Sequence, residues 1–178
     1  MRIIAGEFKS RILKNTKGHR THPMSERIRG ALFNSMGDIS DAIVLDAFAG
    51  TGAVGVEALS RGARHVSAVE MNADSFDVLK ANRDLVTDDE RMSVHRANVK
   101  TWLKNQQRYF DIVIADPPYD NIGMNALDVC AEWVEPGGLL IVSLPPAEHL
   151  SFKNYQKLDE KRYGNAKLVF YRRNQLKK

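Results

Sequence analysis

Apolar residues along this chain follow two alternating patterns. Short aliphatic and β-branched runs, typical of buried strands, occupy residues 43–47, 65–70, 92–96, 110–115 and 139–144. Between these runs, apolar residues recur every three or four positions, which predicts helices over residues 53–61, 74–86, 99–106 and 124–133. Strands that alternate with helices are typical of an α/β domain built on a doubly wound, mostly parallel sheet.

The start of the chain departs from this alternation. Residues 2–6 and 11–13 predict two short strands around a tight basic turn, and we interpret residues 1–24 as an N-terminal β-hairpin extension. A helix with one apolar face follows, with Ser25 as its N-cap and Gly37 at its end.

The end of the chain predicts a second hairpin. Alternating stretches at residues 155–163 and 166–172 flank the dipeptide Gly164-Asn165, which is a turn signal. This antiparallel pair is expected to complete the sheet. Residues 25–178 are therefore predicted to form one domain, a length that suits a single sizeable core.

Composition narrows the class of protein. Hydrophobic residues make up 43% of the 178 residues and charged residues 27%, as in ordinary globular proteins. The absence of an apolar run of about 20 residues or of a signal-peptide core predicts a cytoplasmic protein without a membrane partner. The single cysteine, Cys130, excludes an internal disulfide or a multi-thiolate metal site, and no metal is expected.

Charge is distributed unevenly along the sequence. Residues 1–29 carry a net charge of +6 and residues 153–178 a net charge of +7, whereas residues 30–152 carry −9. Basic ends on an acidic middle indicate a polyanionic partner that the ends contact. Basic termini that merely remain solvated are the alternative explanation.

The strongest chemical signal is the tetrapeptide Asp116-Pro117-Pro118-Tyr119, which follows the strand predicted at 110–115. Proline has no N–H to donate to a sheet, so the strand must end at Asp116 and place this carboxylate at its carboxyl end. Ligands of open α/β sheets bind at that edge. The Asp116 carboxylate and the Pro117 carbonyl can accept from an exocyclic NH2, and Tyr119 can stack on the base that carries it.

A glycine turn that contains Gly50 and Gly52 connects the first strand of the alternation to its helix. It matches the dinucleotide-binding pattern, and Glu70 at the end of the next strand could hold ribose hydroxyls, so a nicotinamide cofactor is one interpretation. Asp46 argues against a nicotinamide cofactor, because a carboxylate before the turn repels a pyrophosphate. The same carboxylate attracts an ammonium and a sulfonium. S-adenosylmethionine has both cations and a ribose, and Asn98 could accept from its adenine amine.

On these residues and several longer motifs, the chain resembles the RsmD-type bacterial 16S rRNA (guanine-N2)-methyltransferases over nearly its whole length. The Asp-Pro-Pro-Tyr motif is shared with adenine-N6 DNA methyltransferases, so the other motifs carry most of the resemblance. They are Arg2-Ile3-Ile4-Ala5-Gly6, His22-Pro23 to Arg27-Ile28-Arg29, Ala31-Leu32-Phe33-Asn34, Asp46-Ala47-Phe48-Ala49-Gly50-Thr51-Gly52, Glu57 to Ala63, Tyr163-Gly164 and Tyr171-Arg172. The chain departs from the family at His22, Met24 and Asn98, where arginine, threonine and aspartate are usual.

The resemblance implies a class I, Rossmann-like methyltransferase fold and methylation of a guanine N2 amine in 16S rRNA, as free RNA or within an assembling 30S subunit. It implies catalytic roles for Asp116, Pro117 and Tyr119. The cofactor residues that it implies are Asp46, Ala47, Phe48, Gly50, Gly52, Glu70, Met71 and Asn98. The basic residues assigned to RNA are Arg2, Lys9, Arg11, Lys14, Arg20 and Arg27.

Other functions remain open at this point. They are an adenine-N6 methyltransferase acting on DNA or RNA, a nicotinamide oxidoreductase and an RNA-binding factor without activity. The N-terminal extension is expected to contact RNA phosphates, and deletion of residues 1–17 is expected to leave cofactor binding largely intact.

Overall fold

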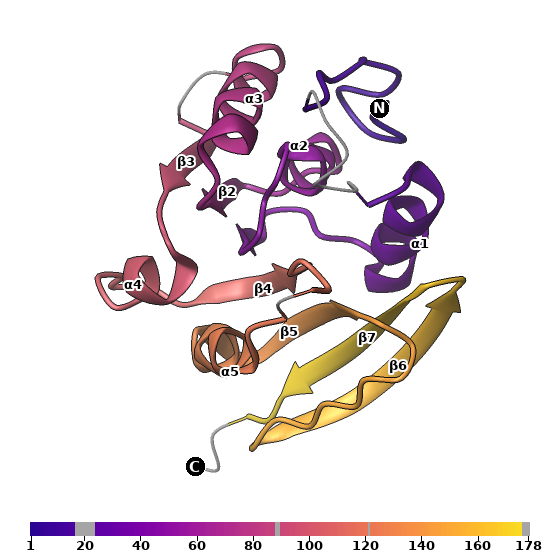
Figure 1. The fold of residues 1–178 in the computed structure, drawn as a ribbon, viewed down its shortest axis with the longest axis vertical. Helices are drawn as coiled ribbons and strands as arrows, with labels where there is room; N and C mark the ends of the chain where they lie inside the picture. The colour runs from indigo at the N-terminus through magenta and orange to yellow at the C-terminus, as the bar shows by residue number, and fades with distance from the viewer. Residues whose placement is uncertain (17–23, 88–89, 121, 176–178) are drawn as a thin grey trace.

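The computed structural model describes residues 1–16, 24–87, 90–120 and 122–175 (Figure 1). Within these residues, seven strands form one sheet in the order β3-β2-β1-β4-β5-β7-β6. The strands are β1 (Ile43–Asp46), β2 (His65–Glu70), β3 (Met92–Arg96), β4 (Phe110–Ala115), β5 (Val134–Leu144), β6 (Tyr155–Tyr163) and β7 (Ala166–Arg173). The helices are α1 (Glu26–Met36), α2 (Ala53–Ser60), α3 (Ala73–Asp84), α4 (Val99–Leu103) and α5 (Met124–Glu132).

The sheet is parallel except at one side. Strands β3, β2, β1, β4 and β5 run in the same direction, whereas β7 pairs antiparallel with both β5 and β6. The doubly wound fold and the closing hairpin, with its turn at Gly164, are therefore confirmed. The strand order reverses between β1 and β4, which is where ligands bind in open α/β sheets.

Helices cover both faces of the sheet (Figure 1). One core cluster joins α1, α2 and α3 to one face through residues such as Phe33, Val56 and Leu79. The other joins α4 and α5 to the opposite face through residues such as Leu103 and Leu127. Successive residues of each central strand point to opposite faces and pack into the two clusters in turn. These strands are therefore apolar at nearly every position.

Among the elements after residue 24, two differ from the sequence prediction by three residues or more, and the other differences are of one or two residues. Strand β5 begins at Val134 rather than at residue 139, because Val134 pairs with Phe110 ahead of an irregularity in the β4–β5 register. Helix α4 ends at Leu103 rather than at residue 106, because residues 104 and 105 form a turn. Each difference lies at an end of an element, where tertiary contacts decide the boundary.

The N-terminal residues form a looped segment whose two arms pair over a short stretch, through backbone bonds from Ile3 to Arg11 and from Leu13 to Met1, rather than as two full strands. One antiparallel bridge joins Arg2 to Ile12, and Gly6 makes the turn at a φ of 85°. Ile3, Phe8 and Leu13 are at most 3% exposed and belong to the same core cluster as α1, α2 and α3. We call residues 1–16 the N-terminal segment. It is packed into the domain core as well as carrying charge on its outer surface.

No helix among the described residues has the length and apolar character needed to cross a membrane.

Candidate active site

The glycine turn between β1 and α2 has the backbone conformation that its sequence predicts. Gly50 and Gly52 have φ values of 54° and 81°, in the region that favours glycine. A Cβ on Gly52 would lie 2.4 Å from Cδ1 of Leu79, so a side chain at this position would collide with α3. We call residues 50–52 the glycine loop. It follows β1 at the edge of the sheet where the strand order reverses.

Asp46 lies at the end of β1, directly before this loop, and is 2% exposed. Its Oδ2 accepts a hydrogen bond of 2.9 Å from the Gly55 N–H in the first turn of α2. Burial is the main cause that raises the pKa of Asp46 to about 7; the charges of Asp116 and Glu70 add to this effect, and the Gly55 hydrogen bond opposes it. The side chain therefore caps a helix, as a structural role would require. At neutral pH it also holds a charge that no cationic side chain of the described residues pairs with, and a positively charged ligand would supply that partner.

Glu70 is the last residue of β2, Met71 follows it, and Asn98 lies two residues after the end of β3. The Glu70 carboxylate accepts from the N–H of Gly50 at 2.8 Å and from the N–H of Asn72 at 2.6 Å. A carboxylate has about four acceptor positions, so it can still accept from ligand hydroxyls. The amide of Asn98 contacts the sulfur of Met71 at 3.8 Å, and its Oδ1 caps α4 through the N–H of Lys100.

Asp116 and Tyr119 follow β4, and the structure adds a third residue, Ser143, near the end of β5. The hydroxyls of Tyr119 and Ser143 lie 2.7 Å apart. Burial raises the pKa of Asp116, and a hydrogen bond with Ser143 lowers it in part. The Ser143 hydroxyl thus hydrogen-bonds to both the Asp116 carboxylate and the Tyr119 hydroxyl, and these bonds hold the half-buried tyrosine ring beside the carboxylate.

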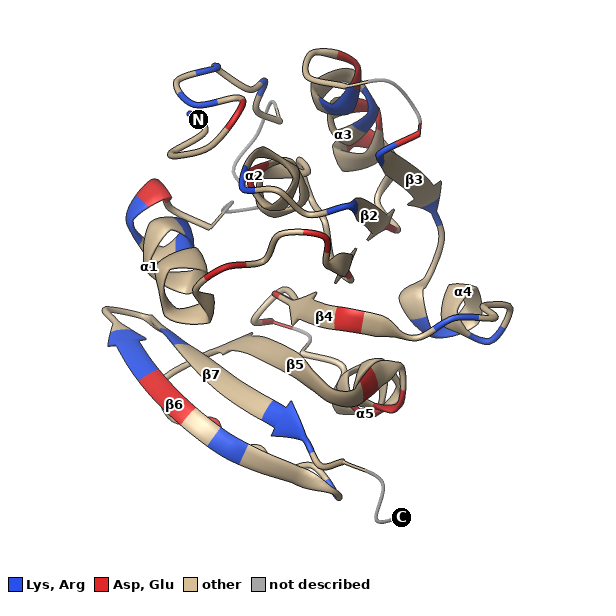
Figure 2. Cartoon of the chain, turned by 180° about the vertical axis from the view of Figure 1, so that it is seen from behind, with Lys and Arg blue, Asp and Glu red and all other residues tan. Residues whose placement is uncertain are grey.

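The predicted basic residues lie on the surface of the N-terminal segment and of α1 (Figure 2). Arg11 donates to the carbonyl of Leu85 and lies over the ring of Phe8, so part of its side chain is ordered by the fold. Arg20 falls outside the described residues. The exposed residues of this set are Arg2, Lys9, Arg11, Lys14 and Arg27.

The structure thus brings the predicted residues to one edge of the sheet. Two carboxylates, Asp46 and Asp116, stand at the ends of the neighbouring strands β1 and β4, close enough for Asp116 to affect the pKa of Asp46. Surface hollows of about 630 and 420 Å³ lie at the opposite, amino-terminal edge of the sheet and contain none of these residues. Within the described ranges, no group of three His, Cys, Asp or Glu side chains could hold a metal ion.

Sequence reasoning missed two buried polar residues of this edge. Ser143 lies inside an apolar strand pattern, and only its position at a strand end marks it. Asn82 lies inside the helix predicted at 74–86, and its amide reaches the carbonyl of Thr51 in the glycine loop at 2.8 Å. Because an asparagine is unfavourable inside a helix, its position there was a signal that could have been noticed.

Comparison with known proteins supports the same interpretation. The family model described as conserved hypothetical protein 95 matches residues 1–172. A ribosomal RNA small subunit methyltransferase D of Haemophilus influenzae is 33% identical over 180 residues, which cover 97% of this chain and 92% of that protein. The protein of the same name from Escherichia coli is 36% identical over 121 residues, or 67% of this chain and 60% of its own length.

Solved structures extend the comparison to the fold. A putative methyltransferase from Escherichia coli superposes with a TM-score of 0.87 at 28% identity, with 99% of each chain covered. A putative methylase from Haemophilus influenzae superposes with a TM-score of 0.80 at 31% identity, with 98% of each chain covered. The chain therefore belongs to the conserved hypothetical protein 95 family, as its resemblance to the RsmD-type methyltransferases predicted, and it has their Rossmann-like methyltransferase fold.

Proposed function

We propose that this protein transfers a methyl group from S-adenosylmethionine to the exocyclic N2 amine of a guanine in 16S rRNA. The observation that carries the proposal is the Asp116 carboxylate. It is half-buried at the point where the strand order reverses, on the strand next to that of Asp46. It is also hydrogen-bonded to Ser143, which in turn bonds to Tyr119, whose ring would stack on a base. The names and extent of its relatives favour ribosomal RNA as the substrate.

The side chains beside the glycine loop fit S-adenosylmethionine, which is the cofactor of this methyltransferase fold. Asp46 offers a carboxylate, unpaired by any cation of the described residues, to the amino and sulfonium charges, and Glu70 offers free acceptor positions for the ribose. Met71 is 66% exposed and provides an apolar surface for the adenine ring, with Asn98 against its sulfur. When bound, the cofactor supplies a methyl group on a sulfonium.

The turn after β4 is suited to hold a planar base. Tyr119 is anchored through its hydroxyl, so its ring is ordered before a base arrives and less entropy is lost on stacking. The target guanine has to leave its stack to reach this ring, at a cost of about a few kcal/mol. The Asp116 carboxylate and the Pro117 carbonyl then accept from the N2 amine and direct its lone pair toward the methyl group.

In this proposal Asp116 is the general base that removes a proton from N2. The reaction forms a bond from N2 to the methyl carbon, breaks the bond from that carbon to sulfur, and leaves one proton too many on N2. The Asp116 carboxylate takes this proton, and S-adenosylhomocysteine is the second product. Burial raises the pKa of Asp116, which brings it closer to neutral pH and makes it a better base than an exposed aspartate.

RNA binding is assigned to the basic surface of the N-terminal segment. Lys14 donates its backbone N–H to Asn82, which in turn contacts the glycine loop, so this surface lies next to the cofactor site. Phosphate contacts there would position the RNA but carry no sequence information. Selection of guanine would therefore depend on the residues of the turn after β4.

The experiment that tests the proposal is the identity of the methylated nucleoside. Small-subunit ribosomal RNA that lacks the modification, free or in isolated subunits, is incubated with the protein and S-adenosylmethionine labelled in its methyl group. We expect label in N2-methylguanosine. Label in N6-methyladenosine would instead support the adenine alternative, to which the Asp-Pro-Pro-Tyr motif is also suited. No product from either RNA form would favour a binding protein without activity.

A further inference from the structure

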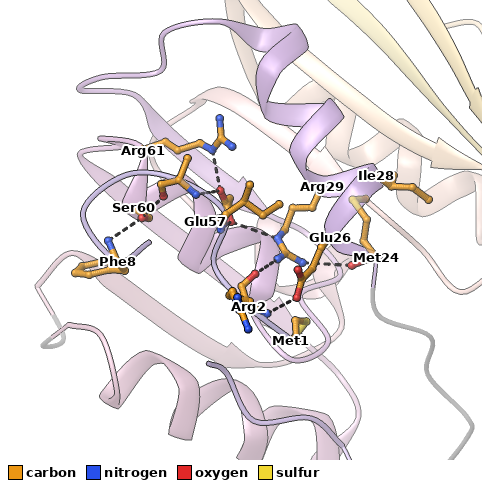
Figure 3. A network of polar contacts seen from close by, with 12 residues as sticks. Met1, Arg2, Phe8, Met24, Glu26, Ile28, Arg29, Glu57, Ser60 and Arg61 are labelled. Atoms are coloured by element: carbon orange, nitrogen blue, oxygen red, sulfur yellow. Dashed lines mark hydrogen bonds and ion pairs between the residues drawn. The ribbon is translucent and has the colours of Figure 1, made fainter. Parts of the chain in front are cut away.

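The N-terminal segment is attached to α2 and α3, the two helices that flank the glycine loop. The buried Glu57 of α2 accepts from the N–H groups of Ile4 and Ala5 at 2.8 and 3.1 Å (Figure 3). Ser60, one turn later, accepts from the N–H of Phe8 at 2.9 Å and donates to the carbonyl of Ala5. Such bonds to the backbone fix the position of the segment on α2.

The buried Arg29 of α1 strengthens this attachment. Its guanidinium contacts a Glu57 oxygen at 3.5 Å and donates to the carbonyls of Arg2 and Met24. The Glu57 carboxylate also accepts from Arg61 at 2.8 Å. The buried charges are therefore paired and hydrogen-bonded, as an ordered buried network requires (Figure 3).

Gly6 shows how closely the segment approaches α2. A Cβ at this position would lie 1.6 Å from the carbonyl oxygen of Ser60, and the φ of Gly6 is 85°. Any side chain here would force the segment away from the helix. Gly6 therefore offers a way to displace the segment without substituting a residue of the cofactor site.

Asn82 connects the segment to the glycine loop. This α3 residue is fully buried, and its amide accepts from the N–H of Lys14 at 2.7 Å and donates to the carbonyl of Lys14 at 3.0 Å. The same amide nitrogen donates to the carbonyl of Thr51 at 2.8 Å. The oxygen of the amide thus binds the segment, and its nitrogen binds both the segment and the loop, through backbone groups that need a partner when buried.

A second contact follows the same route. The sulfur of Met1 lies 3.9 Å from the Thr51 hydroxyl, and the carbonyl of Met1 accepts from the N–H of Leu13. The segment therefore touches Thr51 directly and also through Asn82. Thr51 is the middle residue of the loop whose backbone has to be in place for the cofactor.

We propose that Asn82 is a positioning residue for cofactor binding, which ties the N-terminal segment to Thr51 so that the segment supports the glycine loop. The loop has two glycines and would otherwise sample other conformations, so ordering it in advance raises cofactor affinity. This inference reverses the expectation that the segment is dispensable for cofactor binding. It rests on the cofactor assignment alone and not on the guanine or RNA part of the proposed function.

The test measures S-adenosylmethionine and S-adenosylhomocysteine affinity by calorimetry in two variants, Asn82→Ala and Gly6→Ala. The first removes the connection and the second displaces the segment. We expect each to lose about tenfold in affinity, with a raised KM for the cofactor and a kcat near that of the wild type. The double variant should lose no more than the weaker-binding single variant, because both changes act through one connection.

Matched controls separate positioning from general damage. Asn105→Ala removes an exposed asparagine from the turn that follows α4. Gly164→Ala adds the same methyl at a glycine whose φ is 55° and whose surroundings are open. Both controls should bind the cofactor like the wild type. All variants are compared below their melting temperatures, and if Asn82→Ala does not fold, Gly6→Ala carries the test.

Wild-type affinity in a folded Gly6→Ala protein would overturn the inference, even if Asn82→Ala bound weakly, since the segment would then give the loop no support. Additive losses in the double variant would overturn the shared connection in the same way. If the wild type itself bound neither ligand, the cofactor assignment would fail instead, so the two failures are distinguishable.

Discussion

Asp46 shows how one buried side chain can oppose stability and serve binding. Its pKa of about 7 lies above the 3.8 of an unfolded aspartate, so its contribution to stability is full below pH 3.8 and is lost as the pH rises through 7. The fold therefore tolerates an unfavourable charge at neutral pH. A cationic ligand is the partner that would make the charge favourable.

The first prediction replaces this charge by Asp46→Asn, which keeps an acceptor for the Gly55 N–H. The variant should melt roughly 2–8 °C higher than the wild type at pH 8, because it has no carboxylate to ionise. Its S-adenosylmethionine affinity should fall by about tenfold or more, the loss of one charge-assisted hydrogen bond of about 1.5–3 kcal/mol. Thermal melts and calorimetry test both.

The pH dependence gives the control for Asp46. Wild-type affinity should weaken as the pH falls below about 7, because the carboxyl then has to lose a proton to meet the cation. Asp46→Asn should lack this dependence. An affinity in the wild type that is constant from pH 8 to pH 5.5 would contradict the role given to this carboxylate.

Ser143 leads to a second prediction. Its hydrogen bond lowers the pKa of Asp116 against the larger effect of burial, so Ser143→Ala should raise that pKa. The rising limb of the pH–rate profile should then move to higher pH. Ser143→Thr keeps a hydroxyl and should keep the limb in place. A uniform loss of rate in Ser143→Ala without a shift would mean that the serine only packs.

Residues at strand ends were the ones that the sequence could predict. Asp46, Glu70 and Asp116 follow recognisable apolar runs, so their position at one edge follows from the alternation of strands and helices. Ser143 and Asn82 could not be assigned roles, because their partners are 24 and 31 residues or more away and depend on the tertiary arrangement. Local patterns contain no information about such contacts.

At the scale of elements, the N-terminal segment combines two functions that its sequence suggested only in part. Its charges predicted an outer surface, which the structure has, but its apolar residues indicated a short hairpin. In the structure they enter the core and leave one bridge in place of two strands. The backbone bonds that would extend a hairpin are instead made with Glu57, Ser60 and Asn82.

The third prediction concerns the charged surface of this segment. Replacing Lys9, Arg11 and Lys14 together by alanine should weaken RNA binding and flatten its salt dependence, by about one unit of slope for each phosphate that the protein no longer neutralises. The control replaces Arg64, Lys104 and Arg108, three exposed cations at the opposite edge of the sheet. Binding is measured across a salt series. Equal slopes in the two triple variants would move the RNA-binding surface elsewhere, with the basic hairpin β6–β7 as the next surface to test.

For the whole molecule, the order of strands explains why the site lies where it does. After β1 the chain continues into α2 on one face of the sheet, and after the neighbouring strand β4 it continues into α5 on the other face. The carboxylates at the ends of these two strands therefore lie at the edge where the connections separate. The alternation of strands and helices predicted the parallel sheet and its closing hairpin. It did not fix the strand order, which depends on connections that sequence patterns do not specify.

The fourth prediction tests ligand binding through the stability of the whole fold. At a concentration of 100 times its dissociation constant, a ligand of the native state stabilises the protein by about 2.7 kcal/mol. S-adenosylmethionine should therefore raise the melting temperature by roughly 5–10 °C. NADH should leave it unchanged, because Asp46 repels a pyrophosphate. A shift with NADH alone would restore the oxidoreductase interpretation.

The most direct test of the account separates binding from chemistry at Asp116. Cofactor affinity and methyl transfer to 16S rRNA are measured side by side for the wild type and Asp116→Ala. The variant should bind S-adenosylmethionine as well as the wild type or slightly better, because it removes a charge that raises the pKa of Asp46. Methyl transfer should fall at least about 100-fold, the lower range for a lost general base. Transfer at the wild-type rate would contradict the account, because the reaction would then not depend on the carboxylate at the end of β4.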